Sequence, residues 1–225
     1  MDNRRLKNDI SDIYKVLLAC YGPQHWWPAE TPFEVLVGAI LTQNTAWKNV
    51  ERAIANLKDA GALEAHALWD LPVARLAHLL QPAGYYNVKT VRLRNAVRFL
   101  LDAGDGDPAS LASTDTDTLR GLLLAVSGIG PETADSILLY ALQRPVFVVD
   151  AYTRRIFGRM GLVDPTADYE TIRHHFETRL LRDVLLYNDY HAQIVAHAKS
   201  TCRVRPVCNE CVVSDLCHDR RMTTA

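Results

Sequence analysis

Four of the five cysteines lie close together near the C-terminus, with the spacing C-x5-C-x2-C-x5-C from Cys202 through Cys208 and Cys211 to Cys217. Disulfides are typical of secreted proteins, and we see no secretion signal in this sequence. Thiolates that converge in so short a segment usually bind metal. Zinc sites tend to use two close pairs, whereas a single CxxC with one outer cysteine on each side suits a [4Fe-4S] cluster with four cysteine ligands. The spacing favours the cluster, and zinc or free thiols are the alternatives.

Asp150 and a glycine turn that precedes it are the other groups with a chemical role to consider. Gly128 and Gly130 enclose one apolar residue between two expected helices, and Pro131 opens the second helix. Such a turn exposes backbone N–H groups that can bind a DNA phosphate, although a plain helix–helix turn has the same pattern. Asp150 follows the apolar run 147–149 and precedes a helix. Its simplest role is therefore that of an N-cap.

The elements that must position these groups are helices, and the sequence predicts an all-α fold. Apolar residues recur with helical spacing along almost the whole chain, and Gly, Pro, Asn or Asp separates nearly every pair of segments. Thr31-Pro32-Phe33-Glu34 has the pattern of a capping box. Only Pro145–Val149 looks extended, and Cys20 lies on the first apolar stripe, where we expect it to be buried. The later helices are expected at 72–80, 88–101, 115–125, 131–141, 151–160, 169–181 and 191–199.

Composition and charge set broader limits. The chain has 225 residues, 48% of them hydrophobic, and a net charge of −1, which argues weakly against a nucleic-acid partner. The basic residues are unevenly distributed, so a local basic face is compatible with the sequence. No apolar segment is long enough to span a membrane, and we expect a cytoplasmic, nucleoid-associated protein. The basic groups are Arg4, Arg5 and Lys7; Arg144, Arg154, Arg155 and Arg159; and Lys199, Arg203, Arg205, Arg220 and Arg221.

Taken together, the helix–glycine turn–helix, the Val148-Val149-Asp150 run and the four-cysteine loop resemble the endonuclease III superfamily of DNA glycosylases. The segments 41–45 and 84–89 resemble two further motifs of that family, so the resemblance covers nearly the whole chain. It implies two helical lobes with a cleft between them. One lobe comprises residues 25–136, and the other joins 1–24 to 137–225. The cysteine loop is one residue shorter than is usual in the family.

The resemblance implies a role for each motif in base excision from damaged duplex DNA by a monomeric enzyme. Asp150 would stabilise the positive charge that develops on the sugar as the N-glycosidic bond breaks. Gln43 would fill the gap that the flipped base leaves, and Tyr85 or Tyr86 would insert into the duplex as a wedge. The cysteines would hold the [4Fe-4S] cluster.

Glu132 occupies the position at which bifunctional relatives carry a lysine that attacks the sugar. A carboxylate cannot form an imine, so this position predicts a monofunctional glycosylase without efficient lyase activity. Glu132 also suits the first turn of a helix simply as an acidic residue. Lys48 and Lys89 are the candidate replacements for this lysine, and nothing in the sequence requires either.

Three tryptophans indicate which base is removed. Trp26, Trp27 and Trp47 lie where the 3-methyladenine glycosylase branch of the family has a Trp-Trp-Pro run and an aromatic residue lining the base pocket. Alkylated purines are cationic, and indole faces attract cations. The alternative is that these residues are core side chains.

Three other functions stay open at this point. Lysine-lacking relatives also remove mismatched or deaminated bases, a different lysine would make the enzyme a bifunctional endonuclease III-type glycosylase and lyase, and a non-catalytic DNA-binding iron–sulfur protein would share much of the pattern.

Overall fold

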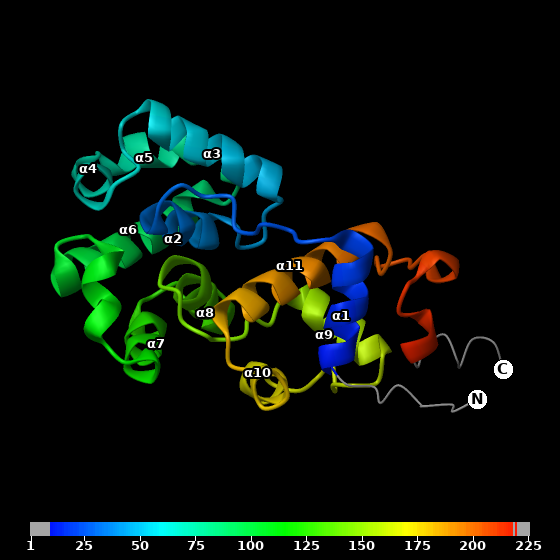
Figure 1. The fold of residues 1–225 in the computed structure, drawn as a ribbon. Helices are drawn as coiled ribbons and strands as arrows, with labels where there is room; N and C mark the ends of the chain where they lie inside the picture. The colour runs from blue at the N-terminus through cyan, green and yellow to red at the C-terminus, as the bar shows by residue number, and fades with distance from the viewer. Residues whose placement is uncertain (1–9, 218, 220–225) are drawn as a thin grey trace, which may run out of the picture. The chain divides into compact units, whose positions relative to one another are not determined.

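The computed structural model describes residues 10–217 and 219, and in this part of the chain it is all-α without strands (Figure 1). None of the described helices is long and apolar enough to cross a membrane. The basic residues Arg4, Arg5, Lys7, Arg220 and Arg221 lie outside the described residues. The α-helices are α1 (Ile10–Tyr21), α2 (Pro32–Leu41), α3 (Trp47–Asp59), α4 (Ala65–Asp70), α5 (Val73–Leu79), α6 (Tyr86–Gly104), α7 (Thr116–Ala125), α8 (Pro131–Ser136), α9 (Ala151–Arg159), α10 (Tyr169–Glu177) and α11 (Val184–Ser200).

The chain forms two compact units. The continuous unit comprises Trp27–Arg144. The discontinuous unit comprises Met1–Trp26 together with Pro145–Ala225. Short helical turns complete them, namely η1 (Gln81–Ala83), η2 (Pro108–Ser113) and the π-helical η3 (Ile137–Ala141) in the first, and η4 (Cys208–Glu210) and η5 (Ser214–Leu216) in the second.

Helix α2 is the centre of the continuous unit, because every residue from Phe33 to Leu41 is buried. It packs against α3, α6, α8 and η3, so its apolar surface is covered on all sides. The expected capping box begins it: the Glu34 amide donates to Thr31 Oγ1 at 3.1 Å. The Glu34 carboxylate accepts from the amide of Glu30, one residue before the N-cap, at 3.1 Å.

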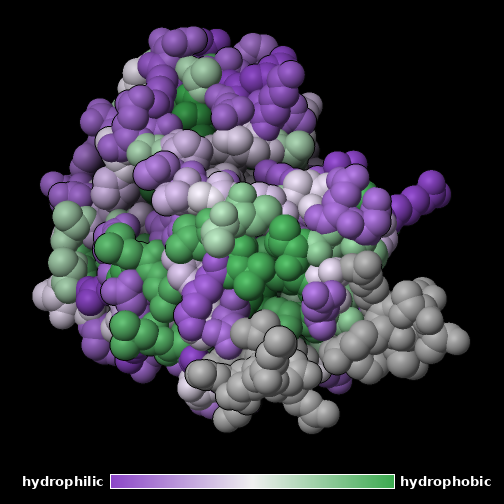
Figure 2. Space-filling model, turned by 45° about the vertical axis from the view of Figure 1, so that its right-hand side comes forward, coloured by the Kyte–Doolittle hydropathy of each residue, from purple (hydrophilic) through white to green (hydrophobic). Residues whose placement is uncertain are grey.

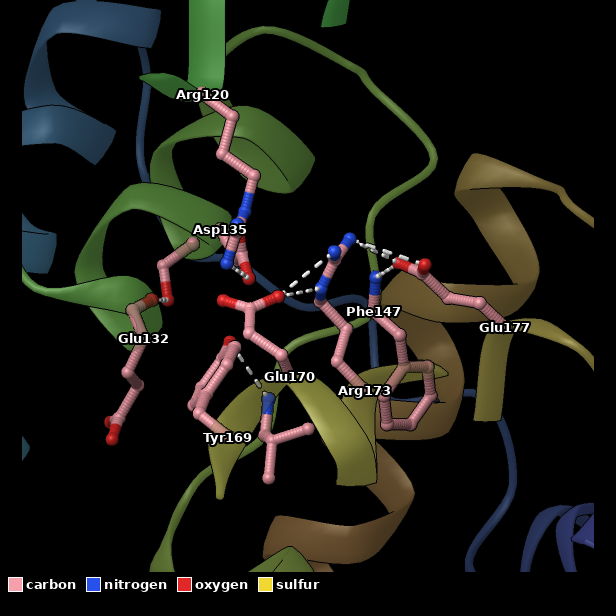
Figure 3. A network of polar contacts seen from close by, with 10 residues as sticks. Arg120, Glu132, Asp135, Phe147, Tyr169, Glu170, Arg173 and Glu177 are labelled. Atoms are coloured by element: carbon pink, nitrogen blue, oxygen red, sulfur yellow. Dashed lines mark hydrogen bonds and ion pairs between the residues drawn. The ribbon is translucent and has the colours of Figure 1, made fainter. Parts of the chain in front are cut away.

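A buried ion pair joins α7 to α8, the two helices of the glycine hairpin (Figure 3). Arg120 donates from Nε and Nη2 to the two carboxylate oxygens of Asp135, at 2.6 and 3.1 Å. The Asp135 side chain is fully buried, and 12% of the Arg120 side chain is exposed. The pair is bidentate, which is the strongest geometry for an arginine and a carboxylate.

Aromatic rings fill the core of the discontinuous unit. Phe147 stacks on Phe176 with centroids 4.2 Å apart, and Tyr187 and Tyr190 meet Phe147 edge-on. Helix α11 runs beside α1 and α9 (Figure 1). The Tyr190 hydroxyl donates to the Ile10 carbonyl at 2.6 Å, which joins α11 to the first residue of α1.

The helix predictions fail at a few places. Helix α10 ends at Glu177 instead of 181, and α11 begins at Val184 instead of 191 because the Asp183 carboxylate caps it, accepting from the Leu186 amide at 2.7 Å. Helix α4 was not expected. The expectation that Cys20 is buried is wrong, because the buried stripe of α1 ends at Leu17, one turn earlier.

Breaking the hairpin ion pair should cost more stability than breaking a surface pair. Asp135→Asn leaves the Arg120 charge buried without its carboxylate, and we expect it to lower the free energy of unfolding by about 3–5 kcal/mol. Asp102→Asn is the control, because the Arg98–Asp102 pair on α6 is exposed and should contribute less than about 1 kcal/mol. Urea denaturation measures both. Equal losses in the two variants would contradict the structural role of the buried pair.

Candidate functional site

Asp150 caps the N-terminus of α9, as the simplest interpretation of the sequence predicts. Its Oδ1 accepts from the Thr153 amide at 2.7 Å and from the Thr153 hydroxyl at 2.8 Å. Its Oδ2 lies 3.5 Å from Nε2 of His191, a residue of α11 that is 6% exposed. The sequence did not link this histidine to Asp150, because only the packing of α11 on α9 brings it to the carboxylate.

These contacts set the ionisation of Asp150. Burial acts to raise the pKa of the carboxyl, but the hydrogen bond and charge of His191 and the two donors of Thr153 outweigh it and hold the pKa below its ordinary value. The carboxylate is therefore ionised at neutral pH. An ionised carboxylate can stabilise a developing positive charge beside it.

The segment before Asp150 is held through its backbone by α10 (Figure 3). The Phe147 amide donates to the Glu177 carboxylate at 2.9 Å, and the Val149 amide donates to the Tyr169 hydroxyl at 3.3 Å. Arg173 in turn binds Glu177 at 3.2 Å. Side chains thus hydrogen-bond to alternate amides of this segment, as a neighbouring strand would. These bonds fix the position of Asp150, the N-cap of α9.

In the continuous unit, Trp27 lies in a cluster of aromatic rings. It meets Trp47 edge-on with centroids 5.1 Å apart, and Tyr140 of η3 at the same distance with a tilt of 42°. Gly38 permits this packing, since a Cβ there would lie 3.2 Å from the Trp27 ring. Trp47 Nε1 donates to Glu51 at 2.8 Å. Trp27 and Trp47 are partly exposed, so the cluster has accessible aromatic surface.

Trp26 belongs to the other unit and has different neighbours. The Lys199 ammonium lies 5.9 Å from the centroid of its ring, within cation–π range. Of the three tryptophans predicted from the sequence, the structure therefore groups two, and Tyr140 is a third member of the cluster that the sequence did not single out.

Gln43 is bound to the glycine hairpin. Its Nε2 donates to the Gly128 carbonyl at 3.1 Å and to Thr133 Oγ1 at 2.9 Å, while its Oε1 accepts from Arg92 of α6. Gly128 has φ +99°, and a Cβ there would lie 2.3 Å from Arg92 Cγ. Glycine is thus required at this position both by conformation and by the close approach of α6.

Gly130 has a different role. It is the N-cap of α8, with φ −94° and ψ 178°, and Pro131 begins the helix. Glu132 is exposed and lies in the first turn of α8, where the helix dipole stabilises an acidic side chain. The structure places no lysine in this turn.

The loop before α6 presents Tyr85 to solvent. Gly84 and Tyr85 both have positive φ, at 65° and 46°, and the Tyr85 side chain is 74% exposed. Tyr86 begins the helix and is partly buried. A non-glycine residue held at positive φ is strained, and such strain is common at functional positions. Exposure and backbone geometry favour Tyr85 over Tyr86 as a residue that meets a partner.

Lys89 joins this loop to the Gln43 loop from inside the protein. Its ammonium donates to the Leu41 and Ala83 carbonyls at 2.6 and 2.8 Å and to the Thr45 hydroxyl. Thr45 Oγ1 also donates to Ala83 O at 2.7 Å. Lys89 is 2% exposed, and burial, with the charge of Arg92, lowers the pKa of its ammonium to about 8. An ammonium that uses its three N–H bonds in this way cannot also attack a sugar.

The four C-terminal cysteines line one cavity, together with Arg159, Thr201, Pro206, Val207, Ser214 and Asp219. Arg159 Nη1 donates to Cys202 Sγ at 3.3 Å, and the same side chain binds the carbonyls of Arg203 and Val204. Burial raises the pKa of the Cys211 thiol, and the charges of the other three cysteines act in the same direction. Four cysteine sulfurs with a guanidinium beside them suit an anionic iron–sulfur group. In the described residues, no three His, Cys, Asp or Glu side chains converge on a single ion position.

The helical hairpin, the capping aspartate and the cysteine loop define the class to which the chain belongs, and the comparisons name it. The model of the HhH-GPD superfamily of base excision DNA repair proteins matches residues 37–181. The sequence is 50% identical to the protein MJ1434 of Methanocaldococcus jannaschii, assigned as a DNA repair glycosylase, over 92% of this chain and 95% of that protein. It is 28% identical to endonuclease III of Escherichia coli over 83% of each.

Solved structures agree with this. The H. pylori 3-methyladenine DNA glycosylase MagIII, bound to 1,N6-ethenoadenine, has a TM-score of 0.74 at 30% identity and covers 85% of this chain and 97% of its own. An endonuclease III–DNA complex has a TM-score of 0.81 at 18% identity and covers 96% of both chains. The chain belongs to the HhH-GPD superfamily and is a base excision repair DNA glycosylase, so the predicted all-α, endonuclease III-like fold is confirmed.

Lys89 gives a prediction for stability and its pH dependence. Lys89→Met leaves buried acceptors without their donor, and we expect a loss of roughly 1–3 kcal/mol at pH 7. Between about pH 8 and the ordinary lysine value of 10.5, the folded wild type has released the proton that its unfolded chain still binds. Wild-type stability therefore rises with pH relative to the variant in this window.

Urea denaturation across pH 7 to 10.5 measures this difference. Lys48→Met is the control, because Lys48 is an exposed lysine of the same unit. A Lys89→Met variant as stable as Lys48→Met, or a constant difference from wild type across the pH range, would contradict the role assigned to the ammonium.

Proposed function

We propose that this glycosylase is monofunctional and excises alkylated purines, such as 3-methyladenine, from duplex DNA. The observation that carries the substrate is the cluster of Trp27, Trp47 and Tyr140. The faces of electron-rich rings attract a cationic base that stacks on them. Alkylation has already weakened the N-glycosidic bond, so few polar contacts to the base are needed to break it. The 30% identity to a 3-methyladenine glycosylase supports the same choice.

Asp150 is the proposed catalytic carboxylate. As the N-glycosidic bond breaks, its electron pair leaves with the base, and the positive charge on the deoxyribose is stabilised by the ionised carboxylate. Water then adds at C1′, and its proton passes to the carboxylate or to solvent. His191 and Thr153 hold the carboxylate in its ionised form and fixed orientation.

Glu132 supports the absence of lyase chemistry. Imine formation requires an amine, and Glu132 stands where bifunctional relatives have lysine. Lys89 does not replace it, since its ammonium is buried and bound to Leu41, Ala83 and Thr45.

Gln43 and Tyr85 are proposed to act on the duplex, Gln43 at the vacated base position and Tyr85 as the wedge. The amides of Gly128 and Gly130 are proposed to contact a phosphate.

The lesion assay tests this function. Duplexes that each carry one lesion (a stable 3-methyladenine analogue, 7-methylguanine, hypoxanthine, uracil, a G·T mismatch or thymine glycol) are incubated with the protein and read with and without alkali. We expect breaks on the alkylated purines alone, and only after alkali. Asp150→Asn should lower the excision rate by at least about 100-fold.

Asp168→Asn is the matched control, because Asp168 caps α10 with the same geometry and should leave the rate unchanged. Breaks without alkali on thymine glycol would overturn the monofunctional assignment, and full activity of Asp150→Asn would overturn the mechanism. In the same assay, Trp27→Leu should lower the excision rate of cationic purines, relative to wild type, by about 2- to 30-fold. Tyr85→Ala should weaken lesion binding more than Tyr86→Ala.

Cys202, Cys208, Cys211 and Cys217 are proposed to hold a [4Fe-4S] cluster. When bound, the cluster would fix the fold of this loop and offer one-electron chemistry. Protein purified without oxygen should contain about four irons and four sulfides per chain. Cys211→Ser should lose them, whereas Cys20→Ser, at an exposed cysteine of α1, should keep them. One zinc per chain without sulfide would contradict the cluster.

A further inference from the structure

A basic pocket on the continuous unit has no role in the function described above. Its volume is about 500 Å³, and three elements form it. Helix α3 contributes Arg52 and Asn56, α5 contributes Arg75, His78 and Leu79, and η1 contributes Gln81 and Pro82. The Asn56 amide donates to the Leu79 carbonyl at 2.9 Å, which fixes α3 against the end of α5 and gives the pocket a defined wall.

The pocket is suited to an anion. No carboxylate lines it, and among the described residues no hydrogen bond or ion pair is made by the side chain of Arg52 or of Arg75. Both guanidinium groups are exposed, so their donors are available to a ligand. A guanidinium binds phosphate oxygens through two parallel N–H bonds, and His78 and Gln81 add further polar groups. The surface that α3, α4 and α5 form at the top of the view is mainly hydrophilic in Figure 2.

The pocket adjoins the proposed wedge in the chain. Gln81 lies four residues before Tyr85, so their Cα atoms are at most about 15 Å apart. Between them, the Ala83 carbonyl is held by Lys89 and Thr45, which makes the loop a fixed connection. A duplex that Tyr85 enters presents backbone phosphates on both sides of the insertion. Phosphate contacts of this kind fix register without reading sequence.

We propose that the Arg52–Arg75 pocket is a phosphate-binding site that takes a phosphate of the DNA backbone beside the wedge loop. The proposal rests on the proposed function only in that Tyr85 is the residue that meets the duplex. The pocket would give this protein, whose net charge is −1, a local cationic contact with DNA that the overall composition does not predict.

Salt dependence of DNA binding tests the site. The dissociation constant for an undamaged duplex is measured at several salt concentrations for wild type and for the double variant Arg52→Gln, Arg75→Gln. We expect the variant to bind several-fold more weakly, equally for all sequences, and its slope of log affinity against log salt to fall in magnitude by about 1–2.

Two controls accompany the double variant. Arg98→Gln removes an exposed arginine of α6 that is already paired with Asp102 and should leave the slope unchanged. Arg52→Lys with Arg75→Lys keeps both charges and should keep most of the slope. An unaltered slope in the Gln double variant, with its melting temperature unchanged, would overturn the proposal. A slope reduced equally by Arg98→Gln would also overturn it.

A second arm identifies the source of the phosphate. Inorganic phosphate and pyrophosphate are titrated into wild type and the double variant by calorimetry. If the double variant loses pyrophosphate binding but keeps its duplex slope, the site takes a free phosphate and the assignment to DNA is wrong. Undamaged duplex binding does not need excision. A reduced slope would therefore stand even if the lesion assay failed, and the two proposals fail separately.

Discussion

An ionised carboxylate is costly to bury. The discontinuous unit is organised around the groups that keep the Asp150 carboxylate ionised although it is largely buried. Two donors from Thr153 satisfy one oxygen, and His191 faces the other. The helix position adds the favourable end of the α9 dipole. His191 would not meet Asp150 without the aromatic core that packs α9, α10 and α11 together, in which Phe147 stacks on Phe176 next to the backbone that leads to Asp150.

The continuous unit uses the same physical means for a different purpose. Buried Lys89 holds the carbonyls of two loops, and the buried Arg120–Asp135 pair joins the helices of the hairpin. Each charge is paired or fully hydrogen-bonded, as burial demands. The result is that the segment 41–45, the loop before α6 and the glycine turn become parts of one hydrogen-bonded assembly. Lys89 joins the first two, and Gln43 joins the first to the turn.

Local signals predicted much of the fold. The Thr31 cap, the Pro131 helix start and the Asp150 cap all depend on neighbours within four residues, so their geometry follows from the local sequence. The predictions failed at α4, which has only six residues, and at the start of α11, which begins at Val184 after its cap Asp183. Cys20 was misplaced because the apolar stripe of α1 continues in the sequence beyond the end of the core.

The sequence by itself determined the all-α class, the order of the motifs and the presence of Glu132 directly after Pro131, because these depend on residue type and spacing. Tertiary structure decided which distant side chains touch. It brought His191 to Asp150, Tyr140 to Trp27, and Lys89 to the Leu41 carbonyl. It also exposed Tyr85 and buried Lys89, although the two residues are only four positions apart. Contacts between residues 40 or more positions apart depend on how helices pack, and helical periodicity specifies only which face of each helix is buried.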